Sequence, residues 1–354
     1  MTVRFVQVGT GFWGASWAPL LRGRADVELV ALVDIDPAAS ARVASEIGLG
    51  DDRCFTTVGD ALAAGLDLDA ALVVVQPEHH EAVTVPALRA GLHCLVEKPI
   101  AHTVASARAI VDEGRRANRV VMVSQNYRFA RAPRTVQRLI AGGAIGTVEQ
   151  VRVDYQTLAE LEGFFTKIPE PIISRWFIHQ GDLVRGVLGV EPVRVRATSW
   201  NPSWSRFEGN ASCLVEMWTE AGAHIVYTGT WASHGEPTPE NGVWDVQGSD
   251  GGIVWAGDSV RLRPRGSDEA EEVTLADLPA EQRAGALLAF LEAVATGQTP
   301  ETGAAANLGT LELLLAALAS VEQGTEVDVR AAALEVGLVA ASPSSPVPVA
   351  APGR

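Results

Sequence analysis

Residues 3–14 read VRFVQVGTGFWG, a short apolar run followed at once by a glycine-rich turn. Gly9, Gly11 and Gly14 have the spacing G-x-G-x-x-G, a weak signal alone in a chain with 34 glycines. Here the glycines follow a strand-like run and open a helix-like stretch, and this context makes the pattern specific. Gly9 permits a tight turn, Gly11 lets the backbone approach a pyrophosphate, and Gly14 lets helix and strand pack closely. The stretch predicts a dinucleotide-binding turn.

The first 125 residues alternate strand-like and helix-like stretches. Runs rich in Val and Leu predict buried strands at residues 3–8, 27–34, 70–75, 93–96 and 119–123. Ala-rich patterns between them predict helices at residues 13–22, 37–47, 80–91 and 103–117. This alternation is typical of a parallel, doubly wound α/β sheet with helices on both faces. We therefore expect an N-terminal Rossmann domain over residues 1–125.

The pattern changes after about residue 128. Period-2 stretches predict several neighbouring strands without helices between them, at residues 148–158, 192–200, 210–219, 223–231, 243–248, 252–256 and 259–263. Such strands favour one mostly antiparallel sheet. Helical patterns are predicted at residues 133–141, 174–188, 280–295 and 304–323. We expect an α+β domain over residues 126–340, whose last helices pack back on the first domain, and a disordered Pro/Ser-rich tail over 341–354.

Composition limits the classes of function. The formal net charge of −15 disfavours nucleic-acid and membrane-surface partners, because an acidic surface repels phosphates and anionic lipid. We expect no apolar run near the roughly 20 residues of a membrane helix, and no secretory signal. The three cysteines are widely spaced and match no zinc pattern. These features predict a reduced, cytoplasmic protein without a bound metal.

An acidic residue follows the second predicted strand. Asp34 lies 20 residues after Gly14, where a carboxylate can accept hydrogen bonds from the ribose hydroxyls of NAD and repel the 2′-phosphate of NADP. Thr10, Phe12 and Trp13, within the glycine turn, are further expected cofactor contacts. The sequence therefore predicts NAD as the cofactor, with NADP disfavoured.

A second motif stands at the fifth predicted strand, where residues 90–101 read AGLHCLVEKPIA. With the glycine turn and EHH at residues 78–80, this stretch resembles the family of glucose–fructose oxidoreductase, inositol dehydrogenase and the rhizopine-catabolism proteins, Gfo/Idh/MocA. The resemblance implies a second domain with an open-faced sheet. It also implies an NAD(P)-dependent oxidoreductase that acts on CH–OH groups of sugars, cyclitols or related polyols.

The resemblance implies roles for residues of the first domain. Lys98 of the E-K-P motif would reach between nicotinamide and substrate, with Glu97 before it and a cis-type Pro99 after it. His80 matches the histidine of the family's T-P-x-x-x-H stretch, although the T-P itself is replaced and Pro77 comes next. We expect Pro77, His80, Glu97 and Lys98 to line the cofactor site.

Two further segments match family motifs. SQNYRF at residues 124–129 resembles the N-x-R-F segment, which implies Asn126 near the cofactor and Arg128 near the substrate. RWFIHQGD at residues 175–182 resembles D-x-x-x-H-x-x-D, which implies that His179 and Asp182 contact substrate.

The leading Asp of the last motif is Arg175 here. Positions 175, 179 and 182 are spaced by four and three, so on an α-helix they share one face. Arg175 could hold a substrate carboxylate in a bidentate fork. It could equally form an ion pair with Asp182 or a nearby Glu.

Lysine is rare in this chain. Of 28 cationic residues only Lys98 and Lys167 are lysines. Because lysine can lose its proton and arginine cannot, a lysine at position 98 suggests that a titratable amine is needed there. Oxidation of a hydroxyl by hydride transfer requires a base for its proton, and an amine serves as that base when burial or a neighbouring cation lowers its pKa. The sequence predicts Lys98 and His179 as the proton-transfer residues.

Seven of the nine tryptophans lie in the second domain, where flat indole faces suit sugar or cyclitol rings. Most of them are expected to pack in the sheet, and the loop SWNPSWSRF (199–207) is the best candidate for substrate contact. Because a broad exposed sheet face is costly, we expect a homodimer or homotetramer through that sheet.

Four functions remain open from the sequence. The first is an NAD-dependent dehydrogenase or reductase of a sugar, cyclitol or glycoside. The second has a carboxylated substrate held by Arg175. The third is a non-catalytic NAD-binding sensor or partner protein. The fourth is glycoside cleavage with transient oxidation by NAD and no net NADH.

Overall fold

The computed structural model describes residues 2–338, which contain two compact units. One unit comprises residues 2–124 and 286–308, and the other comprises residues 125–285 and 309–338. The tail predicted over residues 341–354 lies outside the described residues.

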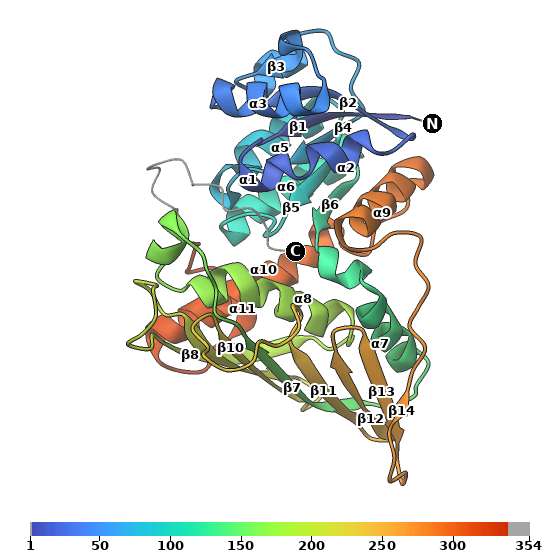
Figure 1. The fold of residues 1–354 in the computed structure, drawn as a ribbon, viewed down its shortest axis with the longest axis vertical. Helices are drawn as coiled ribbons and strands as arrows, with labels where there is room; N and C mark the ends of the chain where they lie inside the picture. Colours follow the sequence, from blue (N-terminus) through green and yellow to red (C-terminus); the bar gives the residue numbers. More distant parts are fainter. Residues whose placement is uncertain (1, 339–354) are drawn as a thin grey trace. The chain divides into compact units, whose positions relative to one another are not determined.

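The first unit is built on a six-stranded parallel sheet with the order β3-β2-β1-β4-β5-β6 (Figure 1). Its strands are β1 (Val3–Val8), β2 (Val27–Val33), β3 (Cys54–Phe55), β4 (Ala70–Val73), β5 (His93–Glu97) and β6 (Val121–Ser124). Its helices are α1 (Phe12–Ala15), α2 (Ala18–Arg22), α3 (Pro37–Ile47), α4 (Val58–Ala63), α5 (His80–Arg89) and α6 (Val104–Ala117), with short 3₁₀ turns at Asp51–Arg53 and Pro77–His79. The strand order is that of a doubly wound dinucleotide fold, as predicted.

The first unit also takes up part of the late chain. Residue Phe290 packs its ring 5.9 Å from that of Phe5, and Val123 N–H donates to the carbonyl of Thr302 at 2.9 Å. Met122 and Gly303 form an isolated antiparallel bridge. Residues 286–308 are therefore integral to the core of this unit.

One local prediction in the first unit was wrong, and two short elements were missed. The helix expected over residues 13–22 is two short helices, α1 and α2, because Pro19 in the first turn of α2 starts a new helix and cannot continue one from before it. The short elements β3 and α4 were not predicted, since stretches of two and six residues carry too little periodicity.

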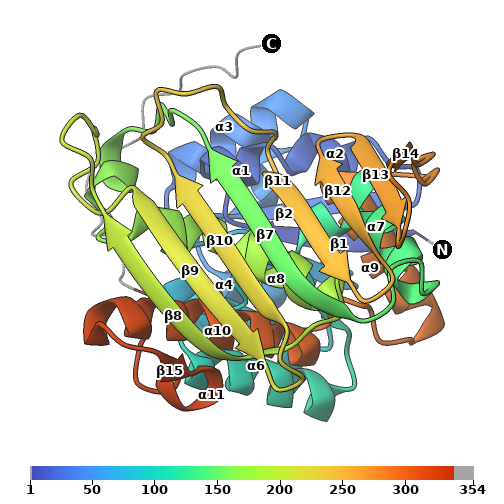
Figure 2. The same ribbon diagram turned by 90° about the horizontal axis from the view of Figure 1, so that it is seen from below.

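The second unit contains a nine-stranded sheet with the order β14-β13-β12-β11-β7-β10-β9-β8-β15. Its strands are β7 (Val148–Gln156), β8 (Pro192–Trp200), β9 (Ser212–Thr219), β10 (His224–Thr230), β11 (Val243–Gly248), β12 (Gly251–Ala256), β13 (Ser259–Pro264), β14 (Glu271–Glu272) and β15 (Val327–Asp328). Of the strand pairs in this sheet, β7 and β10 run parallel and the others antiparallel, so the prediction of a mostly antiparallel sheet is confirmed. Figure 2 shows that no helix crosses the face turned toward the reader. That open face is also as predicted.

The remaining helices are α7 (Arg131–Ala141), α8 (Ile178–Gly186), α9 (Gln282–Thr296), α10 (Ala304–Gln323) and α11 (Val329–Ala332), with 3₁₀ turns at Asn126–Phe129 and Gly163–Lys167. The helix predicted from residue 174 starts earlier, as a π-helical segment, Ile172–Phe177, that leads into α8. Single π-helical turns inserted in helices are frequent at functional sites.

Helix α10 corrects the expectation that no apolar run reaches membrane length. It has 20 residues and a mean hydropathy of 1.6 in its most apolar window, enough to span a membrane by length and composition alone. Within the described structure 67% of that window is buried. Core helices of other proteins can have the same length and hydropathy, so α10 is only weak evidence for a membrane-spanning segment.

Candidate active site

The glycine turn after β1 is shaped by close backbone contacts. Gly9 has φ +98°, and a Cβ there would overlap the carbonyl of Val74, while a Cβ on Gly14 would overlap the carbonyl of Gly9. The buried amide of Gln7 donates to the Gly9 carbonyl at 3.0 Å and to the Gly14 carbonyl at 2.7 Å. Two of the three glycines are thus required by the protein's own packing.

The third glycine faces open space. No heavy atom lies within 4 Å of a Cβ built on Gly11, which has ordinary backbone angles at the start of α1. The large apolar side chains exposed in the described part of this unit are Phe12, Trp13 and Ile35, all beside the turn or the end of β2. A backbone cradle without a Cβ, bordered by exposed apolar side chains, fits a dinucleotide's phosphates and rings.

Asp34 is half-buried at the end of β2 and tied to the turn. Its Oδ2 accepts from the backbone N–H of Thr10 at 2.6 Å and from the Thr10 hydroxyl at 2.8 Å. A carboxylate has about four acceptor sites, so the ribose contact expected of Asp34 stays a compatible prediction. Sequence reasoning missed Arg42, whose guanidinium donates to the Thr10 carbonyl at 3.4 Å.

The E-K-P motif forms a hydrogen-bonded loop after β5. The buried carboxylate of Glu97 accepts from the indole N–H of Trp17 at 2.9 Å and from the backbone N–H of Lys98 at 3.1 Å. The Lys98–Pro99 peptide is cis, as the resemblance implied. Lys98 is half-buried and follows the carboxyl end of β5, the edge of the parallel sheet at which the glycine turn also lies.

His80 is fully buried, and its ring nitrogens lie 3.0 Å from the carbonyl of Val75 and 3.2 Å from that of Ile100. These contacts join the segment after β4 to the segment after Lys98. Burial lowers the pKa of His80 below its ordinary value, although the hydrogen bonds to backbone oppose the shift. His80 therefore supports the Lys98 loop, and its contact with cofactor, like that of the buried Pro77, stays a prediction.

In the second unit His179 lies in an aromatic cluster. Its imidazole stacks on Tyr127 with ring centroids 4.3 Å apart, and Trp176 meets the imidazole edge-on at 5.4 Å. The cluster continues from Trp176 to Tyr155 at 5.0 Å and to Trp231 at 6.2 Å. The indole N–H of Trp176 finds no hydrogen-bond acceptor among the described residues.

The predicted substrate loop 199–207 reaches the same cluster. Its Phe207 ring lies 5.6 Å from that of Trp231, and the Trp204 indole donates to the Ala232 carbonyl at 2.8 Å. The expectation of sheet packing fits Trp244 and Trp255, which are fully buried and stacked at 4.9 Å.

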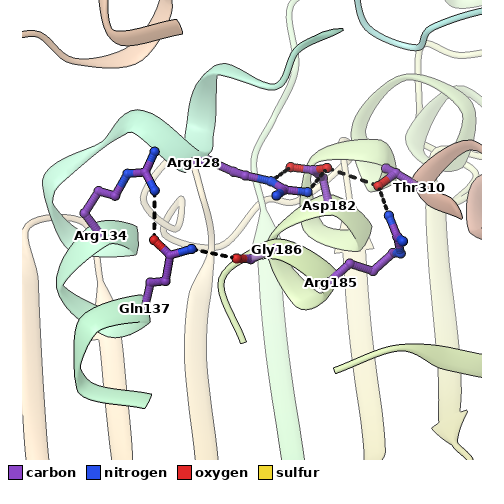
Figure 3. A network of polar contacts seen from close by, with 7 residues as sticks. All are labelled: Arg128, Arg134, Gln137, Asp182, Arg185, Gly186 and Thr310. Atoms are coloured by element: carbon purple, nitrogen blue, oxygen red, sulfur yellow. Dashed lines mark hydrogen bonds and ion pairs between the residues drawn. The ribbon is translucent and has the colours of Figure 1, made fainter. Parts of the chain in front are cut away.

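Arg128 and Asp182 are bonded to one another (Figure 3). The Arg128 guanidinium holds both oxygens of Asp182 at 2.5 and 2.6 Å, and both side chains are buried. Thr310 donates to Asp182 at 3.1 Å and accepts from Arg185 at 2.7 Å. A Cβ at Gly186 would overlap the Arg128 guanidinium and would have to displace it from Asp182.

A second set of hydrogen bonds joins α7 to α8. Arg134 of α7 donates to Gln137 at 2.8 Å, which donates in turn to the Gly186 carbonyl at 2.9 Å (Figure 3). The Arg128–Asp182 pair holds α8, which carries His179, against the turn before α7, and the Gln137 hydrogen bond holds α8 against α7 itself. The direct substrate contacts expected of Arg128 and Asp182 stay predictions.

Two other expected site residues have different surroundings. Asn126 donates its amide to Gln282 at 2.8 Å, and its contact with cofactor stays a prediction. Arg175 lines a cavity of about 250 Å³ whose other polar members include Glu170, Ser174 and Glu322, and whose lining does not include His179.

Sequence reasoning missed Tyr127, Trp176 and Glu240. Tyr127 stands inside the N-x-R-F segment and Trp176 inside the histidine motif, so both carried a positional signal. Glu240 lies on a loop without a motif, and only the structure brings its carboxylate to the Tyr127 hydroxyl, at 2.7 Å.

Two family models match the chain. "Oxidoreductase family, NAD-binding Rossmann fold" matches residues 3–125, and "GFO/IDH/MocA C-terminal domain" matches residues 133–254. The chain belongs to the GFO/IDH/MocA family. It is therefore an oxidoreductase with an NAD-binding Rossmann domain, which confirms the predicted family, enzyme class and cofactor.

Named relatives match either nearly the whole chain or about half of it. D-apiose dehydrogenase of Paraburkholderia graminis is 27% identical, over 96% of this chain and 93% of its own length. Inositol 2-dehydrogenase of Rhizobium meliloti is 33% identical, over 56% of this chain and 59% of its own length. A solved structure of a putative myo-inositol dehydrogenase from Sinorhizobium meliloti has a TM-score of 0.75 and 26% identity, covering 93% of this chain and 100% of that one.

Proposed function

We propose that this protein transfers hydride between nicotinamide and a ring hydroxyl or ketone of a sugar, cyclitol or glycoside. The observation that carries the proposal is the position of Lys98, a half-buried residue whose backbone N–H donates to Glu97 at the carboxyl edge of the dinucleotide sheet. The names of the relatives, dehydrogenases of inositol and apiose, support this substrate class.

The reaction needs a proton acceptor. When bound, nicotinamide supplies the hydride acceptor or donor. Lys98 takes the hydroxyl proton at Nζ during oxidation and returns it during reduction, and the His179 imidazole, in contact with the substrate, is the second acid–base group. The aromatic faces around His179 suit the apolar faces of a sugar or cyclitol ring.

The experiment is a screen of myo-inositol, D-apiose, other sugars and their uronic acids with NAD, followed by absorbance of NADH. We expect Lys98→Ala and His179→Ala to lower kcat/KM at least a hundredfold, the range of acid–base contributions. Lys167→Ala is the matched control, because Lys167 is the other lysine and lies exposed in the second unit. Unchanged turnover in Lys98→Ala would remove Lys98 from the mechanism.

The alternatives are separate outcomes of this screen. NAD binding without redox change for any substrate supports the sensor function, and glycoside cleavage without net NADH supports the transient-oxidation function. A carboxylated substrate held by Arg175 is disfavoured, since Glu170 and Glu322 line the same cavity and would repel it. If Arg175→Asp leaves the ratio of kcat/KM for a sugar and its uronic acid unchanged, that substrate is rejected.

We also propose a preference for NAD over NADP, from Asp34, and a cytoplasmic location. Cys54, Cys94 and Cys213 are unpaired, which suits a reducing compartment. The protein is further proposed to form a homodimer or homotetramer through the open sheet face.

A further inference from the structure

The loop between β10 and β11 brings an exposed carboxylate to the aromatic cluster. Glu240 Oε1 accepts from the Tyr127 hydroxyl at 2.7 Å, although the two residues lie 113 positions apart in the chain. Tyr127 itself is buried, with 5% of its surface exposed. A hydrogen bond from a phenol to a carboxylate is charge-assisted. It fixes the rotation of the Tyr127 ring about its long axis only together with the packing of that ring against its neighbours.

The loop is held on both sides of Glu240. Before it, Thr238 N–H donates to the Gln156 carbonyl at 2.9 Å. After it, Gly242 N–H donates to the Pro239 carbonyl at 2.7 Å, and the Trp244 indole donates to the Asn241 carbonyl at 2.7 Å. The carboxylate is thus presented by an anchored turn.

Tyr127 passes this restraint to His179. Burial first, and then the charge of Glu240, raises the pKa of the Tyr127 phenol, so the phenol is neutral and donates its proton. Its ring stacks on the imidazole at 4.3 Å with an angle of 28° between the planes, and Trp176 lies edge-on to both rings. Moving the Tyr127 ring would therefore move the imidazole.

We propose that Glu240 is a positioning residue for His179 and acts through the Tyr127 hydroxyl. Glu240 donates no proton to substrate in this proposal; it keeps the phenol ring, and hence the imidazole, in one orientation. The inference rests on the proposed function, in which His179 contacts the substrate. It adds a carboxylate that no sequence motif marks.

The test compares steady-state kinetics of Glu240→Ala, Tyr127→Phe and the double variant on a substrate found in the screen. Each single variant is expected to lower kcat about tenfold, the effect of one lost hydrogen bond to a charged group, with KM changed less than about twofold. The double variant is expected to have the same kcat as each single variant, because each single substitution already removes the Tyr127–Glu240 hydrogen bond. Losses that multiply, or a Glu240→Ala variant with wild-type kcat, would overturn the proposal.

Two further variants separate the loss of the Glu240–Tyr127 hydrogen bond from the mere loss of a negative charge in this loop. Glu240→Gln keeps an acceptor oxygen and is expected to retain kcat within about threefold. Glu236→Ala removes a charge from the same loop, and within residues 2–338 the hydrogen bond of Glu236 is accepted by its main-chain carbonyl, which the variant keeps; its kcat is expected to match that of the wild type. Failure of the proposed function is distinct: His179→Ala would then keep wild-type turnover.

A readout without substrate is the imidazole NMR signal of His179, assigned by its loss in His179→Asn. Ring-current shifts depend on the orientation of Tyr127, so we expect the signal to move in Glu240→Ala and Tyr127→Phe and to stay in Glu236→Ala. An unmoved signal in Glu240→Ala contradicts the inference even if no substrate is found.

Discussion

At the scale of single residues, the buried ion pair of Arg128 and Asp182 holds α8 against the turn before α7. Breaking a buried ion pair leaves one charge without its partner, which costs about 3 kcal/mol or more. We expect Arg128→Met to lower the free energy of unfolding by that amount in denaturant titrations. The neighbouring Gly186→Ala should act in the same direction, through overlap with the guanidinium.

The double variant Arg128→Met/Asp182→Leu is the control. Because it removes both charges, it should be more stable than Arg128→Met alone. Equal or lower stability of the double variant would mean that the charges themselves are not the source of the loss.

His80 makes the free energy of unfolding depend on pH. Its pKa is lowered by burial from 6.5, so below that pH the unfolded chain binds a proton that the folded chain does not. The stability from the neutral ring is present above pH 6.5 and declines as the pH falls. His93 shifts in the same direction, through burial and the nearby Arg119.

We expect the free energy of unfolding to be lower at pH 5.5 than at pH 7.5, and the difference to shrink in His80→Gln. The exposed His79→Gln is the control and should keep the wild-type difference. An unchanged pH dependence in His80→Gln would show that other groups cause it.

At the scale of elements, the glycines of the turn between β1 and α1 have different roles: Gly9 is needed for packing, and Gly11 is expected to serve NAD binding. Gly11→Ala meets no atom within 4 Å and no backbone strain, so its thermal unfolding should match the wild type. The added methyl group lies where the backbone must approach a pyrophosphate, so NAD affinity by calorimetry should fall about tenfold or more.

Gly9→Ala is the contrasting variant, because φ +98° and the Val74 carbonyl oppose any Cβ. It should lose stability as well as NAD affinity. If Gly11→Ala binds NAD like the wild type, the turn does not hold the dinucleotide phosphates.

At the scale of the whole molecule, the open sheet face carries rows of side chains set by strand register. One row crosses β8 to β13 as Arg196, Glu216, Val226, Arg152, Asp245, Val254 and Arg261. Alternating charges around apolar residues can complement a second copy of the same row in a two-fold contact. Figure 2 shows this face without a covering helix.

We expect sedimentation to give a dimer or larger oligomer for the wild type and a smaller species for Val226→Asp, which adds a third acid to the row. Arg22→Asp, on an exposed position of α2 in the first unit, should leave the mass unchanged. A monomeric wild type would refute assembly through the sheet.

Much of the fold could be predicted from the sequence, because the signals are local. Buried parallel strands read as runs of Val and Leu, and half-buried antiparallel strands alternate, so both sheets and the glycine turn of Gly9, Gly11 and Gly14 were predicted. The break at Pro19 and the elements β3 and α4 were missed, since they depend on too few residues to leave a period.

Motif positions also led to Lys98 and His179 as the expected proton-transfer residues, because chemistry restricts which residue types can move a proton; their roles stay predictions. Tertiary structure alone decided their surroundings. The Arg128–Asp182 pair spans 54 positions and the Tyr127–Glu240 hydrogen bond spans 113, and no local pattern encodes such a meeting. Contacts between distant residues depend on how strands and loops pack, which is a property of the folded chain.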